Sequence, residues 1–195
     1  KGTAFLNRLL VVITTKMQKC DFFIYLPFMK KVVLIFSFLL LAAGCVKEEQ
    51  KGADLKVGDI IPDFEVVMSD GETVTDQILQ ESVSVVMFFH TSCPDCQATL
   101  PIVKEIYDIY AQKGVGFALI SREEGTEEIE SYWTEQSYNM PYSAQNDRSV
   151  YNLFASSRIP RIYISDENGT VRYIFTDDPV ATVEDLRSSL DILIR

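Results

Sequence analysis

Two cysteines three positions apart are the residues of this chain best suited to chemistry. They are Cys93 and Cys96, within the stretch FFHTSCPDCQATL at residues 88–100. Two thiols at this spacing could hold a metal, close a structural disulfide, or exchange disulfides with other molecules.

Exchange is the chemistry that we predict. A zinc site takes four ligands. Cys20 is expected to be lost with the N-terminal leader and Cys45 to carry a lipid, which leaves this pair and one imidazole, His90. A structural disulfide over so short a loop would remove little entropy from the unfolded chain. We therefore expect no metal and no cofactor other than the redox-active Cys93–Cys96 disulfide.

The neighbouring residues predict the elements that position the pair. Val83–Phe89 is a nearly unbroken apolar run, as in a strand buried on both faces. Pro94 suits the first turn of a helix, and apolar residues then recur at helical spacing. Cys93 would lie at the helix N-terminus, where unpaired N–H groups favour a thiolate, with Cys96 one turn later.

The remaining segments alternate between strand and helix patterns. Alternation requires a parallel crossover, and a hairpin near the C-terminus requires an antiparallel edge. We predict one α/β domain at residues 57–195, with a central mixed sheet flanked by helices. The expected strands are 64–68, 72–74, 83–89, 115–121, a short one within the loop 139–147, 161–165 and 170–175, and the expected helices are 94–113, 126–136, 148–155 and 183–194.

The segment upstream predicts export. Residues 29–44 have a basic start, an uncharged apolar stretch and small residues before Cys45, which indicates a signal peptide. It is shorter than the ~20 residues of a bilayer span. Its A-A-G-C ending resembles the lipobox of bacterial lipoproteins, which implies that Cys45 is lipidated. The alternatives are an incidental cysteine after an ordinary signal peptide and a retained transmembrane anchor.

The rest of the N-terminal region follows from this prediction. Residues 45–56 are polar and charged, as expected of a tether between lipid and domain. Residues 1–28 precede a complete signal peptide and begin with Lys1, so we predict an over-extended gene start. From Cys45 onward the chain carries 12 basic and 27 acidic residues, a net charge of −15. Such a charge argues against nucleic acid and anionic membrane surfaces as partners.

These motifs together resemble the thioredoxin fold, and most of all the TlpA/ResA-like membrane-anchored thiol-disulfide oxidoreductases. The resemblance rests on C-P-D-C after an apolar strand, Pro101 in the following helix, Ile159-Pro160 before a strand, and the segment I-I-P-D-F-x-V-x-x-x-D-G. It covers nearly all of residues 57–195. It implies a thioredoxin fold with an N-terminal β-hairpin and an inserted helix.

The resemblance also implies roles for individual residues. Cys93 would be the exposed attacking thiolate and Cys96 the buried resolving thiol. Pro160 would follow a cis peptide bond, leaving the Ile159 backbone free to pair with an extended substrate. The implied partners are an exported protein with a disulfide or thiols and a membrane electron donor. The implied location is the bacterial cell envelope, facing the periplasm; Val46 favours the outer membrane over the inner one.

The chain departs from the family at the proton acceptor of the resolving thiol. Thioredoxins carry a buried aspartate on the strand before the motif, and the matching residue here is Met87. TlpA/ResA-like proteins often have a glutamate three residues after the second cysteine, where this chain has Thr99. Asp95, between the cysteines, would disfavour a nearby thiolate and is expected to point to solvent. His90 could assist proton transfer, with a structural role as the alternative.

Two arginines and a tryptophan complete the candidate residues. Arg161 and Arg122 could each stabilise a thiolate or contact an acidic partner; a solvated charge at a strand end is the alternative for both. Trp133 is expected to pack rather than to bind substrate.

The predicted function is the reduction of disulfides in exported proteins. The C-P-x-C motif leaves open whether the protein reduces or oxidises its substrates. One alternative is a thiol peroxidase, whose P-x-x-x-T-x-x-C signature would need proline at Val86 and threonine at His90. The other is a lipoprotein that uses the fold to bind a partner and has a redox-idle pair.

Overall fold

The computed structural model describes residues 54–194. The predicted gene extension at 1–28, the predicted signal peptide at 29–44 and the predicted lipidation site Cys45 lie outside this range. So does most of the predicted tether at 45–56. No helix within the described range is long and apolar enough to cross a lipid bilayer.

A five-stranded mixed sheet forms the centre of the domain, in the order β5-β4-β3-β6-β7. β3 (Ser84–Phe89) pairs in parallel with β4 (Gly116–Ser121) and antiparallel with β6 (Arg161–Ser165). β5 (Tyr142–Ser143) extends the parallel side, and β7 (Val171–Phe175) extends the antiparallel side. The predicted mixed sheet is therefore confirmed.

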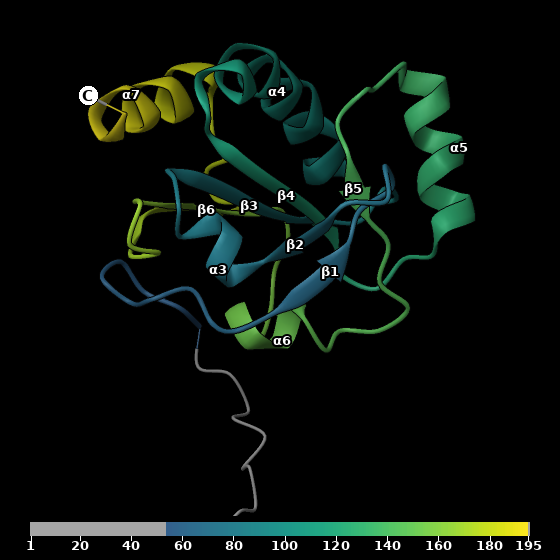
Figure 1. The fold of residues 1–195 in the computed structure, drawn as a ribbon. Coiled ribbons are helices and arrows are strands. Elements are labelled where there is room, and N and C mark those ends of the chain that lie inside the picture. The colour runs from purple at the N-terminus through teal and green to yellow at the C-terminus, as the bar shows by residue number, and fades with distance from the viewer. Residues whose placement is uncertain (1–53, 195) are drawn as a thin grey trace, which may run out of the picture. The chain divides into compact units, whose positions relative to one another are not determined.

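Helices cover both faces of this sheet (Figure 1). α4 (Pro94–Tyr110), continued by a 3₁₀ turn at Ala111–Lys113, lies with α7 (Val183–Leu193) on one face. α6 (Tyr151–Phe154) lies on the other face, and it is shorter than the predicted helix 148–155. The predicted inserted helix is α5 (Thr126–Gln136), which lies beside the β5 edge (Figure 1).

An N-terminal hairpin forms a separate two-stranded sheet, as predicted. β1 (Glu65–Val67) pairs antiparallel with β2 (Thr73–Thr75). The sequence analysis missed α3 (Asp76–Leu79), which follows at once. Thr75 begins this helix, because its hydroxyl accepts a hydrogen bond from the Ile78 N–H at 3.2 Å. Four residues are too few to show a helical repeat, and here the cap defines the helix.

β3 is the centre of the core, and all six of its residues are buried. Its apolar run was the sequence signal for a two-sided strand, and the structure covers both of its faces. Phe88 packs against three aromatic rings, with centroid distances of 5.4 Å to Tyr151, 4.9 Å to Phe154 and 6.4 Å to Tyr163. The next side chain, Phe89, lies 5.1 Å from the ring of Trp133. This packing fixes the end of β3, from which the cysteine segment continues.

Candidate active site

The two cysteines lie at the first turn of α4. Cys93 is the N-cap residue with an extended backbone, and Pro94 occupies the first helical turn. The Cys93 N–H donates to the His90 carbonyl at 3.1 Å, which closes the turn between β3 and α4. Cys93 is half-buried, Cys96 is fully buried, and both are free thiols. The structure thus places one accessible and one inaccessible sulfur side by side.

The environment of Cys96 strongly favours its protonated form. Burial raises the pKa of the Cys96 thiol far above its ordinary value, and the hydrogen bond and charge of Cys93 raise it further. A hydrogen bond from the His90 backbone and the positive charge of Arg122 oppose these effects. The raised pKa means that Cys96 needs a proton acceptor before it can attack as a thiolate.

The Ile159–Pro160 loop faces the accessible thiol. Its peptide bond is cis, as the resemblance implied. The Cys93 thiol donates to the Ile159 carbonyl oxygen, with an S···O distance of 3.6 Å. A backbone segment next to the reactive sulfur is suited to pairing with an extended substrate. A second cis bond, Asp178–Pro179, was not predicted.

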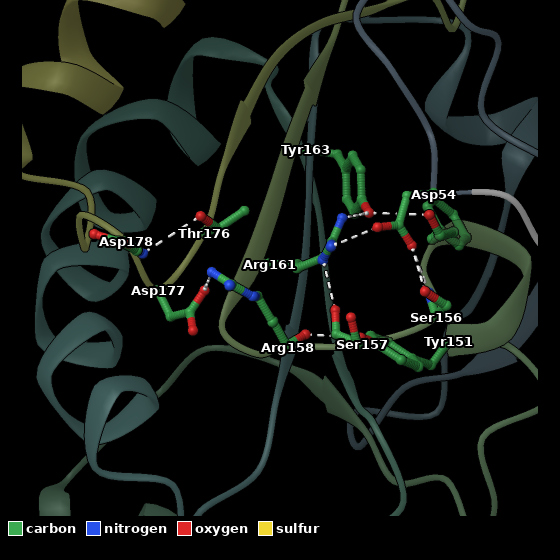
Figure 2. Close-up of polar contacts among 11 residues, drawn as sticks. Asp54, Tyr151, Ser156, Ser157, Arg158, Arg161, Tyr163, Thr176, Asp177 and Asp178 are labelled. Carbon is green, nitrogen blue, oxygen red and sulfur yellow. Dashed lines mark hydrogen bonds and ion pairs between the residues drawn. The ribbon is translucent and has the colours of Figure 1, made fainter.

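Side chains from several elements hold the loop that leads into Pro160 (Figure 2). Arg158 has a left-handed backbone, with φ of 71°. Its carbonyl accepts a hydrogen bond from the Tyr151 hydroxyl at 2.7 Å, and its guanidinium lies 3.5 Å from Asp177. Arg161 donates from Nε to the Ser157 carbonyl at 3.1 Å. These contacts fix the backbone on the N-terminal side of the cis bond.

Arg161 is buried, so its alternative assignment as a solvated charge is wrong. Its Nη2 lies 3.0 Å from Asp54 Oδ2, and its Nη1 donates to the Tyr163 hydroxyl at 3.4 Å (Figure 2). Asp54 also accepts from the Ser156 N–H at 2.7 Å and from the Ser156 hydroxyl at 2.9 Å. The guanidinium therefore contacts an acid of its own chain, and it ties residue 54 to the base of the Pro160 loop.

Replacing Asp54 by asparagine should remove its ion pair with Arg161 and destabilise the domain at pH 7. The loss should be only about 1 kcal/mol, because the Asp54 carboxylate is partly exposed to solvent. Hydrogen bonds from Ser156, offset in part by burial, and the charge of Arg161 hold the pKa of Asp54 below its usual 3.8. The stabilisation is therefore complete above pH 3.8 and is lost as the pH falls through the lower folded-state pKa.

Urea unfolding of the wild type and the Asp54→Asn variant at pH 7 and at pH 2–3 checks this expectation. The exposed Asp63 provides a matched control, because Asp63→Asn should change the free energy of unfolding by less than about 0.5 kcal/mol. A difference for Asp54→Asn that stays constant down to the acid limit would contradict the assignment.

Two of the predicted auxiliary residues have no visible role at the sulfurs. Asp95 is exposed, as expected. Thr99 is buried, and its hydroxyl donates to the Asp95 carbonyl at 2.6 Å, so it bonds within its own helix. Met87 is fully buried in the core. Neither Met87 nor Thr99 therefore supplies a proton acceptor for Cys96.

Sequence reasoning missed one residue of the site, Glu124. It is buried, and it accepts hydrogen bonds from the Thr91 N–H at 2.8 Å and from the Thr91 hydroxyl. Its Oε1 lies 3.4 Å from Nδ1 of His90. The only sequence signal that could have pointed to Glu124 was the predicted order of the strands. Because β3 and β4 are parallel, residues just beyond Ser121 come close to those just beyond Phe89.

Arg122 and Trp133 also flank the site. Arg122 pairs with Glu123 at 2.7 Å, and its charge lowers the pKa of Cys96 without overcoming the effect of burial. Trp133 is buried and donates from Nε1 to the Met140 carbonyl at 2.9 Å, which confirms the packing role. Among residues 54–194, no three His, Cys, Asp or Glu side chains are grouped so that they could hold a metal ion.

A five-stranded sheet of this topology, with paired thiols at the N-terminus of the helix after β3 and a cis-proline loop against them, defines a thioredoxin-like thiol-disulfide oxidoreductase. The chain belongs to the Redoxin family, whose model matches residues 56–190.

Individual relatives agree with this class. Thiol-disulfide oxidoreductase ResA of Geobacillus thermodenitrificans is 27% identical over 137 residues, which cover 69% of this chain and 76% of the relative. A thioredoxin-family thiol:disulfide interchange protein from Chlorobium tepidum shares the fold with a TM-score of 0.62 and 21% identity, over 73% of this chain and 100% of that one. The thioredoxin domain of a thiol-disulfide oxidoreductase from Bacteroides vulgatus also gives 0.62, at 16% identity, over 73% and 100% of the two chains.

Proposed function

We propose that this protein reduces disulfides of exported proteins through the Cys93–Cys96 dithiol. One observation carries the proposal: an accessible thiol and a buried thiol share the first turn of α4, and the accessible one touches the Ile159 carbonyl. An extended substrate that pairs with this backbone would bring its disulfide to Cys93.

The reaction proceeds in two exchanges that need no cofactor beyond the cysteine pair. The Cys93 thiolate attacks one sulfur of the substrate disulfide, whose S–S bond breaks, and the other substrate sulfur leaves as a thiolate. Cys96 then loses its proton and attacks the Cys93 sulfur, which releases the second substrate sulfur. The substrate gains two electrons and the pair becomes a disulfide. A membrane electron donor reduces the pair again.

The proposed place of action is the cell envelope, on its periplasmic side. Support comes from the apolar segment at 29–44 and from the A-A-G-C ending at Cys45, which resembles a lipobox. A lipid on Cys45 would anchor the domain through the tether at 45–56, with the outer membrane favoured over the inner one. Mass spectrometry of the N-terminal peptide of the mature protein tests this, because a lipidated Cys45 carries a diacylglyceryl group.

The activity is tested by the turbidity that appears when insulin disulfides are reduced, with dithiothreitol as the electron source. The wild type should accelerate the reaction, and hydrogen peroxide should not be consumed. Consumption of peroxide would indicate the peroxidase alternative. If Cys93 and Cys96 never cycle between dithiol and disulfide, the alternative of a partner-binding lipoprotein with a redox-idle pair would hold.

The reduction potential of Cys93–Cys96, equilibrated in defined thiol buffers, tests the direction of exchange. A value near or below about −250 mV, as in thioredoxin, would support a reductase. A value near about −120 mV would make the protein an oxidant and contradict the proposed direction.

A further inference from the structure

The backbone that faces the accessible thiol belongs to a loop, residues 155–160, which joins α6 to β6. The carbonyl oxygen of Ile159 in this loop lies 3.6 Å from the Cys93 sulfur. Pairing with an extended substrate requires backbone donors and acceptors in fixed positions, so a displaced loop would present a substrate disulfide poorly. The contacts that hold the loop therefore bear on substrate binding as well as on stability.

The side chains of Arg161 and Asp54 make the buried part of these contacts (Figure 2). Arg161 donates from Nε to the Ser157 carbonyl at 3.1 Å, and its Nη2 lies 3.0 Å from Oδ2 of Asp54. Oδ1 of Asp54 accepts from the Ser156 N–H at 2.7 Å and from the Ser156 hydroxyl at 2.9 Å. One carboxylate thus holds the loop at two places, directly at Ser156 and through the guanidinium at Ser157.

The segment that carries Asp54 is attached to the domain by backbone hydrogen bonds of its own. The Leu55 N–H donates to the Phe154 carbonyl at 2.9 Å, and the Gly58 N–H donates to the Val171 carbonyl at 2.8 Å. These bonds attach residues 55–58 to the end of α6 and to the start of β7. The carboxylate of Asp54 therefore has a defined position against which the loop can be held.

A second ion pair of the loop is weaker than this one. Nη1 of Arg158 lies 3.5 Å from Asp177, and the Arg158 side chain is 57% exposed, so water screens the pair. The guanidinium of Arg161 is buried instead, and a buried charge that loses its carboxylate must move to find another acceptor. Loss of Asp54 should therefore displace Arg161 together with the Ser157 carbonyl to which it is bonded.

We propose that Asp54 is a positioning residue for substrate binding, which holds the backbone before Pro160 in the conformation that pairs with an extended peptide. It acts through Ser156 and Arg161, and the inference rests on the proposed exchange chemistry at Cys93. A peptide disulfide gains from pairing with the loop, whereas a small disulfide reaches the sulfur without it. Asp54 thus determines how strongly the protein prefers peptide disulfides over small ones.

The test compares two disulfides with the same leaving group, in the full chain held in detergent. One is a short, uncharged, capped peptide whose central cysteine forms a mixed disulfide with 5-thio-2-nitrobenzoate, and the other is a single capped cysteine with the same group. In the background chain, Cys20→Ser, Cys45→Ser and Cys96→Ser leave Cys93 as the only thiol. The Cys93 thiolate bonds to the cysteine sulfur, the S–S bond breaks, and coloured 5-thio-2-nitrobenzoate leaves.

The ratio of the two second-order rate constants, peptide over single cysteine, measures the gain from pairing. In the background chain it should be about ten or more, and Asp54→Ala should lower it by about tenfold, with the single-cysteine rate changed less than about twofold. Asp54→Asn should give an intermediate ratio, because its amide oxygen still accepts from Ser156 but carries no charge for Arg161. If circular dichroism shows that Asp54→Ala does not fold, Asp54→Asn supplies the test.

Asp166→Ala is the matched control for a loss of stability. Asp166 also accepts from two backbone N–H groups, those of Asn168 and Thr170, and pairs with Arg172 at 3.2 Å. It follows the other end of β6, in the turn that leads to β7. Its replacement removes contacts of the same kind without touching the loop, so the ratio should stay at the background value.

The remaining outcomes are distinct. A ratio that is unchanged in Asp54→Ala, an equal fall for both disulfides, or an equal fall of the ratio in Asp166→Ala overturns the positioning role and leaves the exchange chemistry intact. A background ratio near one also overturns it, because there would be no pairing to position. A background chain that releases no chromophore from either disulfide overturns the proposed function itself.

Discussion

Cys93→Ser is expected to abolish insulin reduction, a loss of about 10³-fold or more. A serine hydroxyl remains protonated at neutral pH and cannot form a disulfide, so the first exchange has no nucleophile. The position of Cys93 makes this loss specific, because it is the accessible sulfur of the pair and the one that touches the Ile159 carbonyl. Turnover of insulin with dithiothreitol measures the effect.

Cys96→Ser serves as the matched variant and should fail at a different step. Its Cys93 can still attack, but nothing releases the substrate, so a mixed disulfide accumulates. Intact-mass spectrometry should show one covalently bound substrate on Cys96→Ser and none on Cys93→Ser. Substantial turnover by Cys93→Ser, or the reverse pattern of trapping, would contradict the assigned order of attack.

The largest expected effect on stability comes from Phe88→Ala, which should lower the free energy of unfolding by about 3–5 kcal/mol. Phe88 is fully buried at the centre of the sheet, and its ring packs against Tyr151, Phe154 and Tyr163. Truncation removes these contacts and leaves a cavity that rigid neighbouring strands cannot close. Urea unfolding followed by far-ultraviolet circular dichroism measures the loss.

The same ring also supports the site indirectly. Tyr151 holds the Arg158 carbonyl, and Tyr163 contacts Arg161, so a cavity at Phe88 should loosen the loop that leads to Pro160. Ile192→Ala is the control, because this side chain of α7 is 55% exposed and its truncation should cost less than about 0.5 kcal/mol. Equal losses for the two variants would refute the central position assigned to Phe88.

Patterns within short segments were enough to predict most of the fold. The apolar run of β3 and the helical repeat of α4 placed the cysteines at a strand-to-helix junction, because both patterns come from burial of neighbouring residues. The terminal hairpin and the inserted helix were predicted for the same reason. α3 was missed because its four residues show no repeat, and its cap is a single contact.

Contacts between distant segments could not be predicted in this way. The sequence singled out Arg161 as a charge beside Pro160, yet its partner Asp54 is more than a hundred positions away. Glu124 is one of several acids in a charged stretch, and nothing in that stretch marks it as the buried one.

By itself, the sequence predicted a pair of thiols at a helix start and a proline that can face them. Spacing along the chain is sufficient for this, because a helix turn brings residues i and i+3 together wherever it forms. Only the tertiary structure decided which acid lies beside His90 and what holds the cis-proline loop. These depend on the parallel pairing of β3 with β4 and on the packing around β6, which bring together residues that share no local pattern.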